Sequence, residues 1–313
     1  MNIASIDIGT NTVLLLIASL NDNGAIKPLL NVYRVPRIGK NVSNGTPIHD
    51  EKINELIQIL NEYKTLIDKY DCTQVFAYAT NALRIASNSQ FVINKVKQEI
   101  GIDIEVISGS DEAKYGFMGA VSGIQETNDL EVIDIGGGST EIIIGDKFGN
   151  YAFKQSFPIG VVLLTEKYHI THQLNKEILD ETKNYLMELF APLAQLEYGS
   201  SSISAIGGTP TSLYSIKNKL NEFDEKLIEG KYLSVSDLTE LNEYLIQTSP
   251  EDLLGQFDKI VRGREDLLLS GSLILNTAVE LLRCSDVRIT TRGLRYGMIC
   301  DYSTKIFGKY SVE

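Results

Sequence analysis

One pattern occurs twice in this chain and limits the folds that the chain can adopt. Residues 3–20 read IASIDIGTNTVLLLIASL, and residues 130–146 read LEVIDIGGGSTEIIIGD. Each stretch is a short apolar segment ending in Asp-Ile-Gly, then a small polar loop and a second apolar segment. Short apolar runs bounded by glycine-rich turns are typical of buried strands. Each copy is therefore predicted to begin with antiparallel strands joined by a glycine-rich turn.

Strands and helices alternate after each copy of the pattern. Helical spacing of apolar residues and capping residues predict helices over residues 50–69, 88–101, 111–121, 175–196, 209–220, 236–247, 265–283 and 293–306. Short apolar runs predict strands over residues 75–79, 102–107, 203–206 and 287–290. Two copies of this order predict two related α/β lobes across a cleft. The first lobe is expected to hold residues 1–122 and a C-terminal helix at about 299–313, and the second lobe residues 123–298.

Composition narrows the classes of function. A chain of 313 residues with 43% apolar residues can form a packed core, and its length favours two domains. The net charge of −12 argues against a general nucleic-acid binder or an anionic-membrane binder. The chain has three scattered cysteines, no CxxC motif and no signal peptide or membrane-spanning run, so we expect a cytoplasmic protein.

Three loops of small residues follow predicted strands and are suited to phosphate. They are residues 7–12 (DIGTNT), 134–140 (DIGGGST) and 206–209 (IGGT). Glycines let the backbone approach an anion closely, and hydroxyl groups add hydrogen-bond donors. The third loop also opens a helix, whose N-terminus favours phosphate.

Carboxylates accompany two of these loops. Asp7 and Asp134 begin their loops, and Glu141 follows Asp134 by seven residues across the turn. Mg²⁺ prefers one or two carboxylates together with substrate phosphate oxygens. These three residues are therefore the candidate metal ligands.

The motifs together resemble one family over almost the whole chain. They are DIGTNT at 7–12, ATNALRIASN at 79–88, EVISGSDEAKYGFMGA at 105–120, DIGGGSTE at 134–141, IGGTPTSL at 206–213 and GLRYGMI at 293–299. The chain resembles the exopolyphosphatase / guanosine pentaphosphate phosphohydrolase family. That resemblance implies a duplicated actin / sugar kinase / Hsp70-like (RNase H-like) fold with an interdomain cleft. It also implies hydrolysis of a terminal phosphate from polyphosphate, or of the 5′-γ-phosphate of guanosine pentaphosphate, a molecule of the stringent response.

The resemblance also assigns roles to residues. Glu112 matches the family's catalytic base, and Asp134 and Glu141 match acidic residues that hold the metal or orient the water. The phosphate-binding residues that it implies are Thr10, Asn11, Thr12, Arg84, Gly136, Gly137, Gly138, Ser139, Gly208 and Thr209. The family implies Mg²⁺ as cofactor, K⁺ as an activator and a homodimer.

This chain departs from the family pattern, and two other functions stay open. Leu14 stands where the family often has Arg or His, and the chain lacks the His-Asp pair of the HD-type domain found in long members. A non-catalytic sensor of polyphosphate or alarmone, and a kinase of the same fold, are the alternatives. Closure of the lobes is expected to use hinge glycines, namely Gly119, Gly123, Gly293 and Gly297.

Overall fold

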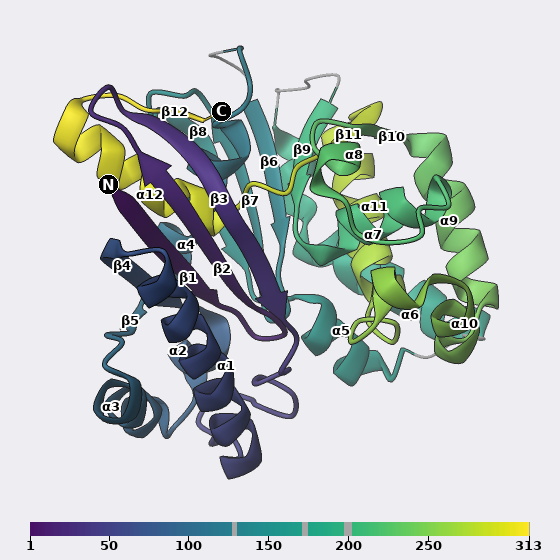
Figure 1. Cartoon of the computed structure of the whole chain (residues 1–313). Helices are drawn as coiled ribbons and strands as arrows, with labels where there is room; N and C mark the ends of the chain where they lie inside the picture. Colours follow the sequence, from purple (N-terminus) through teal and green to yellow (C-terminus); the bar gives the residue numbers. More distant parts are fainter. Residues whose placement is uncertain (127–129, 171–174, 197–201, 313) are drawn as a thin grey trace. The chain divides into compact units, whose positions relative to one another are not determined.

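The computed structural model describes residues 1–126, 130–170, 175–196 and 202–312, and the chain forms two compact units (Figure 1). Unit 1 comprises Met1–Gln125 and Arg292–Glu313, and unit 2 comprises Glu126–Thr291. Unit 2 is therefore an insertion into the chain of unit 1. The chain returns to unit 1 at Arg292, somewhat before the position at about 299 that the sequence suggested.

Unit 1 contains one sheet with helices on both faces. Its elements are β1 (Asn2–Ile8), β2 (Val13–Leu20), β3 (Ala25–Arg34), α1 (Asp50–Lys69), β4 (Cys72–Ala79), α2 (Asn81–Ile85), α3 (Ser89–Ile100), β5 (Glu105–Val106), α4 (Gly109–Val121), α12 (Leu294–Phe307) and β12 (Ser311–Val312). Among the described residues the strand order is β12-β3-β2-β1-β4-β5. Strands β1, β2 and β3 are antiparallel, whereas β4 runs parallel to β1 and β5 runs parallel to β4.

Alternation of side chains along β1 separates the two cores of unit 1. Ile6 and Ile8 face a core that includes residues of α1 and α3. Ile3 belongs to the opposite core with Tyr296 and Ile299 of α12. Figure 1 shows α12 in yellow beside the purple strands β1–β3, although all of unit 2 separates them in the sequence.

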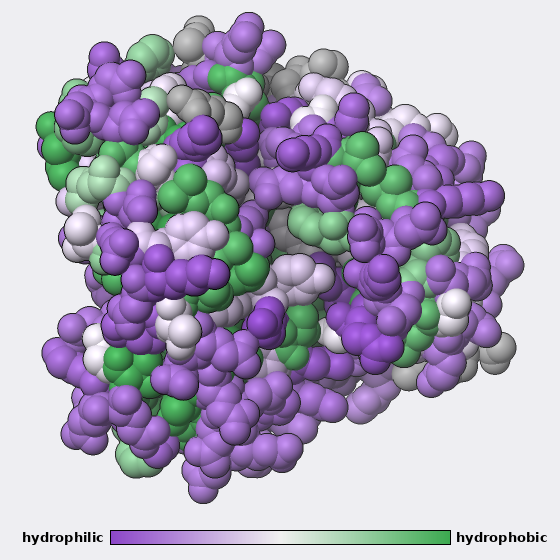
Figure 2. All heavy atoms as spheres, viewed as in Figure 1, coloured by the Kyte–Doolittle hydropathy of each residue, from purple (hydrophilic) through white to green (hydrophobic). Residues whose placement is uncertain are grey.

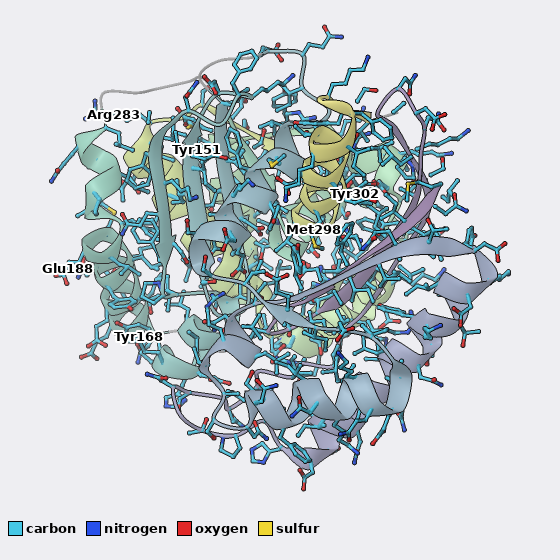
Figure 3. The ribbon with its side chains drawn as sticks, turned by 90° about the vertical axis from the view of Figure 1, so that its left-hand side faces the viewer. Tyr151, Tyr168, Glu188, Arg283, Met298 and Tyr302 are labelled. Carbon is cyan, nitrogen blue, oxygen red and sulfur yellow. The ribbon has the colours of Figure 1, made fainter. Side chains whose placement is uncertain are left out.

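Helix α12 is fixed by packing as well as by the sheet. Figure 3 shows Met298 and Tyr302 one turn apart on this helix. Met298 packs with Ile107, and the Tyr302 ring meets Phe76 of β4 edge-on with 5.2 Å between centroids. The helix is therefore held to the same side of the sheet as α4.

Unit 2 repeats the arrangement. Its elements are β6 (Leu130–Ile135), β7 (Thr140–Gly145), β8 (Tyr151–Phe157), α5 (Val161–Tyr168), α6 (Lys176–Leu189), the 3₁₀ helix η1 (Ala191–Gln195), β9 (Ser202–Ile206), α7 (Gly208–Lys217), α8 (Glu225–Ile228), β10 (Tyr232–Ser234), α9 (Val235–Gln247), α10 (Pro250–Val261), α11 (Leu268–Leu282) and β11 (Asp286–Ile289). In the described part of unit 2 the strand order is β8-β7-β6-β9-β11-β10. Strands β6, β7 and β8 are antiparallel, and β9 and β11 continue the sheet in parallel with β6. Both units thus share the strand order 3-2-1-4, with β5 and β11 next to the fourth strand in their sheets. This common order confirms the predicted duplicated actin-like α/β fold.

Several predicted elements differ from the structure in ways that local chemistry explains. The single helix predicted over 175–196 is two, because Pro192 lies at the start of η1 and cannot continue a regular α-helix. The strand predicted over 102–107 pairs only at Glu105–Val106. Helix α10 was missed, although Ser249 caps it by accepting from the Asp252 N–H and Pro250 occupies its first turn.

The surface visible in Figure 2 is mostly hydrophilic, with small separate hydrophobic groups. Within the described ranges, no helix combines the length and the hydrophobicity needed to cross a bilayer.

Candidate active site

The first glycine-rich loop is a tight turn between β1 and β2. The Gly9 N–H donates to the Thr12 carbonyl oxygen at 2.9 Å, and a Cβ on Gly9 would lie 3.1 Å from that oxygen. Thr10 and Asn11 are buried within the turn, and the Asn11 Nδ2 lies 3.4 Å from the Thr12 hydroxyl. The turn is therefore rigid and carries its predicted hydroxyl groups.

The second loop, between β6 and β7, repeats the same hydrogen bond. The Gly136 N–H donates to the Ser139 carbonyl oxygen at 3.0 Å. The carbonyls of Gly136 and Gly137 accept from the first N–H groups of α5, Val161 at 3.0 Å and Val162 at 2.9 Å. Two loop carbonyls are thereby neutralised by a helix N-terminus, which lowers their repulsion of an anion at the loop.

The third loop opens helix α7. Gly207 has φ of +109°, a conformation that favours glycine, and a Cβ there would lie 2.9 Å from the Ile135 carbonyl oxygen. A Cβ on Gly208 would lie 2.0 Å from Nη1 of Arg264, so this guanidinium group lies against the first turn of α7. Thr209 is buried against Gly271 of α11. The Arg264 guanidinium group therefore brings a positive charge to the N-terminus of α7.

Glu112 is the centre of a charged cluster in unit 1. Ser108 caps α4 by accepting from the Asp111 N–H at 3.1 Å, which places Glu112 in the first turn of the helix, where it is 8% exposed. Arg84 Nη1 donates to Glu112 Oε2 at 3.0 Å and to the Ile107 carbonyl at 2.9 Å. Burial raises the pKa of Glu112, and the Arg84 charge opposes this shift.

Asp7 is a second carboxylate in this cluster. Burial and then the Glu112 carboxylate raise the pKa of Asp7 to about 7, and the charge of Arg295 opposes them. Arg295 is buried in α12 and its guanidinium donates to the side-chain amide oxygen of Asn31 in β3. Unit 1 thus places two acids and two arginines beside the first loop, at the carboxyl end of β1.

Unit 2 has a different pair of acids. Asp134 of β6 lies directly opposite Glu141 of β7, and Glu141 lies opposite Ser156 of β8, so the three side chains share one face of the sheet. Glu141 is 1% exposed, and its Oε1 accepts from the Ser156 hydroxyl at 2.6 Å. Two carboxylates on adjacent strands suit Mg²⁺, which takes few protein ligands and completes its shell with water and phosphate. No three His, Cys, Asp or Glu side chains come together as a metal site among the described residues. Asp7, the third candidate metal ligand, belongs to unit 1, whereas Asp134 and Glu141 belong to unit 2.

Comparison with known proteins identifies the family. The sequence profile of the Ppx/GppA phosphatase family matches residues 16–305. This chain belongs to the Ppx/GppA phosphatase family. The match covers the second repeat, residues 130–146, and both phosphate-type loops after the first, in agreement with the resemblance found in the motifs.

Individual relatives agree with this assignment. A bifunctional 3-dehydroquinate synthase/phosphatase of Fusobacterium nucleatum is 30% identical over 289 residues, which are 88% of this chain and 43% of that protein. A guanosine-5′-triphosphate,3′-diphosphate pyrophosphatase of Aliivibrio fischeri is 26% identical over 95% of this chain and 59% of its own length. The chain therefore spans only part of both relatives.

Solved structures cover this Ppx/GppA chain more completely. The Aquifex aeolicus family member is 29% identical, with a TM-score of 0.82 over 97% of this chain and 98% of its own. An exopolyphosphatase from Cytophaga hutchinsonii is 26% identical, with a TM-score of 0.89 over the full length of both chains.

The structure places the predicted site residues in two groups. Unit 1 holds Asp7, Thr10, Asn11, Thr12, Arg84 and Glu112, and unit 2 holds Asp134, Gly136, Gly137, Gly138, Ser139, Glu141, Gly208 and Thr209. Arg264 and Arg295 were not among the site residues predicted from the sequence. The motif GLRYGMI contains Arg295 and could have indicated it, whereas only the packing against Gly208 shows the position of Arg264.

Proposed function

We propose that this Ppx/GppA protein is a phosphohydrolase that releases the terminal phosphate of inorganic polyphosphate. Membership of the phosphatase family supports this proposal, as does the likeness to the Cytophaga hutchinsonii exopolyphosphatase over the whole chain. The 5′-phosphate of guanosine pentaphosphate is the alternative substrate, supported by the relative from Aliivibrio fischeri.

The buried Glu112 carboxylate carries the proposal. Attack on a phosphoryl group needs a water molecule and a base that takes its proton. Burial raises the pKa of Glu112 and makes it a stronger base, while Arg84 keeps the carboxylate available in its ionised form. Arg84 also offers a planar guanidinium group, which suits phosphate oxygens.

We assign Asp134 and Glu141 to Mg²⁺ and the glycine-rich loops to phosphate. Bound Mg²⁺ would neutralise negative charge on the phosphate oxygens. Asp134 and Glu141 would bind the metal, with the Ser156 hydroxyl fixing the orientation of Glu141. Arg264 would add a positive charge at the loop of Gly208 and Thr209. Under this proposal unit 1 supplies the base, Glu112, and unit 2 supplies the metal ligands, Asp134 and Glu141.

We also place this activity in the cytoplasm. The three thiols of Cys72, Cys284 and Cys300 are free. Burial raises the pKa of Cys300, which suits an inert thiol in a reducing compartment. A homodimer and activation by K⁺ remain further proposals from the family resemblance.

The deciding experiment compares orthophosphate release from short polyphosphate, long polyphosphate and guanosine pentaphosphate, without an acceptor. Wild type is expected to release phosphate, and Glu112→Gln is expected to lower kcat by roughly 10²–10⁴-fold, the usual contribution of a general base. Glu105→Gln, which changes an exposed acid on β5, is the matched control. If Glu112→Gln keeps more than half the wild-type rate, Glu112 is excluded as the base.

The wild-type protein also distinguishes the alternative functions. Tight binding of polyphosphate or guanosine pentaphosphate without turnover would support the sensor, and phosphate release that depends on an added acceptor would support the kinase.

A further inference from the structure

The segment between β3 and α1, residues 35–49, runs directly along the first glycine-rich loop. The Arg37 N–H donates to the Asn11 carbonyl at 3.0 Å, and the Gly39 N–H donates to the Thr10 carbonyl at 2.9 Å. These are the two residues at the tip of the turn. The backbone of residues 37–39 is therefore docked on the loop by successive hydrogen bonds.

The same segment is also fixed to the part of unit 1 that carries Arg84. A Cβ on Gly39 would lie 2.3 Å from Thr10 Cγ2 and 3.2 Å from Ala82 Cβ, so Gly39 fills the narrow space between the loop and α2. Further along, the Gly45 N–H donates to the Ile85 carbonyl at 3.0 Å, directly after Arg84.

Asn88 completes this attachment. Its side chain accepts from the Ile48 N–H at 2.9 Å and donates to the Ile48 carbonyl at 2.8 Å. Asn88 thus binds backbone of the segment, and the segment is held at both ends.

The docked segment places two cations next to the loop. Arg37 is half-buried and Lys40 is exposed. Arg37 has φ of +56°, a left-handed conformation that is unfavourable for a residue other than glycine and persists only where the surroundings impose it. On the strand that follows the loop, Leu14 provides no charge. The docked segment therefore adds two positive charges to those of Arg84 and Arg295 near the loop.

We propose that Arg37 and Lys40 form a phosphate subsite that binds phosphate groups of a polyphosphate chain beyond the one that is released. The inference rests on the proposed function and specifies its substrate as a linear chain longer than its reacting end. Each phosphate of such a chain carries negative charge, and two cations on a backbone segment held by hydrogen bonds can bind more than one of these phosphates. The subsite adds affinity and does not take part in the chemical step.

The test measures KM and kcat on long and on short polyphosphate for Arg37→Gln, Lys40→Gln and the double variant. The double variant is expected to raise KM for long polyphosphate by about tenfold or more, the effect of losing charged hydrogen bonds, with kcat within about twofold. The ratio of KM values for short and long chains should fall towards one. Arg34→Gln is the matched control, because Arg34 ends β3 just before the segment and its guanidinium pairs with exposed Glu62 at 3.1 Å.

Two further measurements distinguish loss of the subsite from a structural defect and from failure of the proposed function. Arg37→Lys keeps the charge, and its KM should lie between those of wild type and Arg37→Gln, which a merely structural defect of Arg37→Gln would not produce. Direct binding of long polyphosphate to Glu112→Gln and to its triple variant with both Gln substitutions tests the subsite without turnover. An active wild type with an unchanged KM in the double variant overturns the subsite alone. An inactive wild type overturns the proposed function, and the binding pair then decides the subsite: equal affinities overturn it, and at least about tenfold weaker binding by the triple variant supports it.

Discussion

Leu14 in β2 occupies the same place in its hairpin as Glu141 occupies in β7. Glu141 lies opposite Asp134, and Leu14 lies opposite Asp7 in the corresponding register. The two copies of the repeat have therefore diverged at one cross-strand position. In unit 1 the second acid near Asp7 is instead Glu112 from α4. The proposed metal ligands are thus a pair of carboxylates on adjacent strands, whereas the proposed base, Glu112, comes from a helix and lies near Asp7.

Removing a carboxylate from the strand pair should weaken metal binding. Asp134→Asn and Glu141→Gln are each expected to raise the Mg²⁺ concentration for half-maximal phosphate release by roughly tenfold or more, because each loses a negative ligand. Magnesium titrations of activity measure the effect. Asp146→Asn, in the turn between β7 and β8, is the control, since Asp146 binds backbone N–H groups of its own turn. Full activity of wild type in excess chelator would contradict the metal assignment.

The stability of the protein should depend on pH through Asp7. Its pKa is raised to about 7 in the folded state, above the usual value near 4, so folding takes up a proton between these values. Stability from this group is present below pH 4 and is lost as the pH rises to about 7. The melting temperature of Asp7→Asn relative to wild type should therefore increase from pH 4 to pH 7 and then level off. Asp22→Asn, an exposed acid, is the control. Parallel curves for Asp7→Asn and wild type would refute the raised pKa.

A methyl group at Gly297 should destabilise unit 1. A Cβ on Gly297 would lie 1.8 Å from the Tyr115 carbonyl oxygen, and one on Gly119 would lie 2.0 Å from the Gly293 carbonyl oxygen. Helices α4 and α12 thus cross with their backbones in contact. Gly297→Ala is expected to cost about 1–3 kcal/mol or more in the free energy of unfolding, measured by denaturant.

Gly255→Ala provides the opposite control. Gly255 lies in α10 with no atom within 4 Å of its Cβ position, so alanine there should stabilise by up to about 1 kcal/mol through helix propensity. If Gly297→Ala were as stable as wild type, the close crossing of α4 and α12 would be wrong.

Two arginines near α7 should behave differently. Arg264→Gln is expected to lower kcat/KM by at least about tenfold, because it removes the guanidinium group that lies against Gly208. Arg262→Gln, two residues earlier, should stay within about twofold, because Arg262 is exposed and pairs with Asp258. Steady-state kinetics on polyphosphate tests both variants. Equal effects of the two substitutions would show that only general charge matters.

Local patterns predicted the repeated part of the fold because the Asp-Ile-Gly turns and the apolar strands are short-range signals. Helix α1 begins at Asp50 and ends at Lys69 as its spacing predicted. Helix α3 ends at Ile100, and Gly101 caps it in the left-handed conformation expected of a glycine after a helix. The predicted loop residues lie after the first strand of each unit, β1 or β6, because the sequence motifs themselves form the turns there.

Contacts between distant segments could not be predicted in this way. Gly119, Gly123, Gly293 and Gly297 were predicted as hinge candidates. In the structure Gly119 and Gly297 lie in the crossing of α4 and α12, and a Cβ on Gly123 would lie 2.8 Å from Nη1 of Arg292. Close packing of these glycines was not predicted, and their role as hinges stays a prediction. Arg264 and Arg295 were missed for the same reason, because their neighbours are far away in the sequence.

Helix α12 has a consequence for how the chain acquires its structure during synthesis. Domains generally fold as units while the ribosome is still adding residues. Unit 2 is complete at Thr291, whereas unit 1 still lacks α12 at that point. Until α12 is made, Ile3 and Leu16 have no cover from Tyr296 and Ile299, and Arg295 is absent beside Asp7. When the first 291 residues have been made, unit 2 is therefore complete, whereas unit 1 still has an exposed apolar face on its sheet. Unit 1 can complete its core only when α12 has been synthesised.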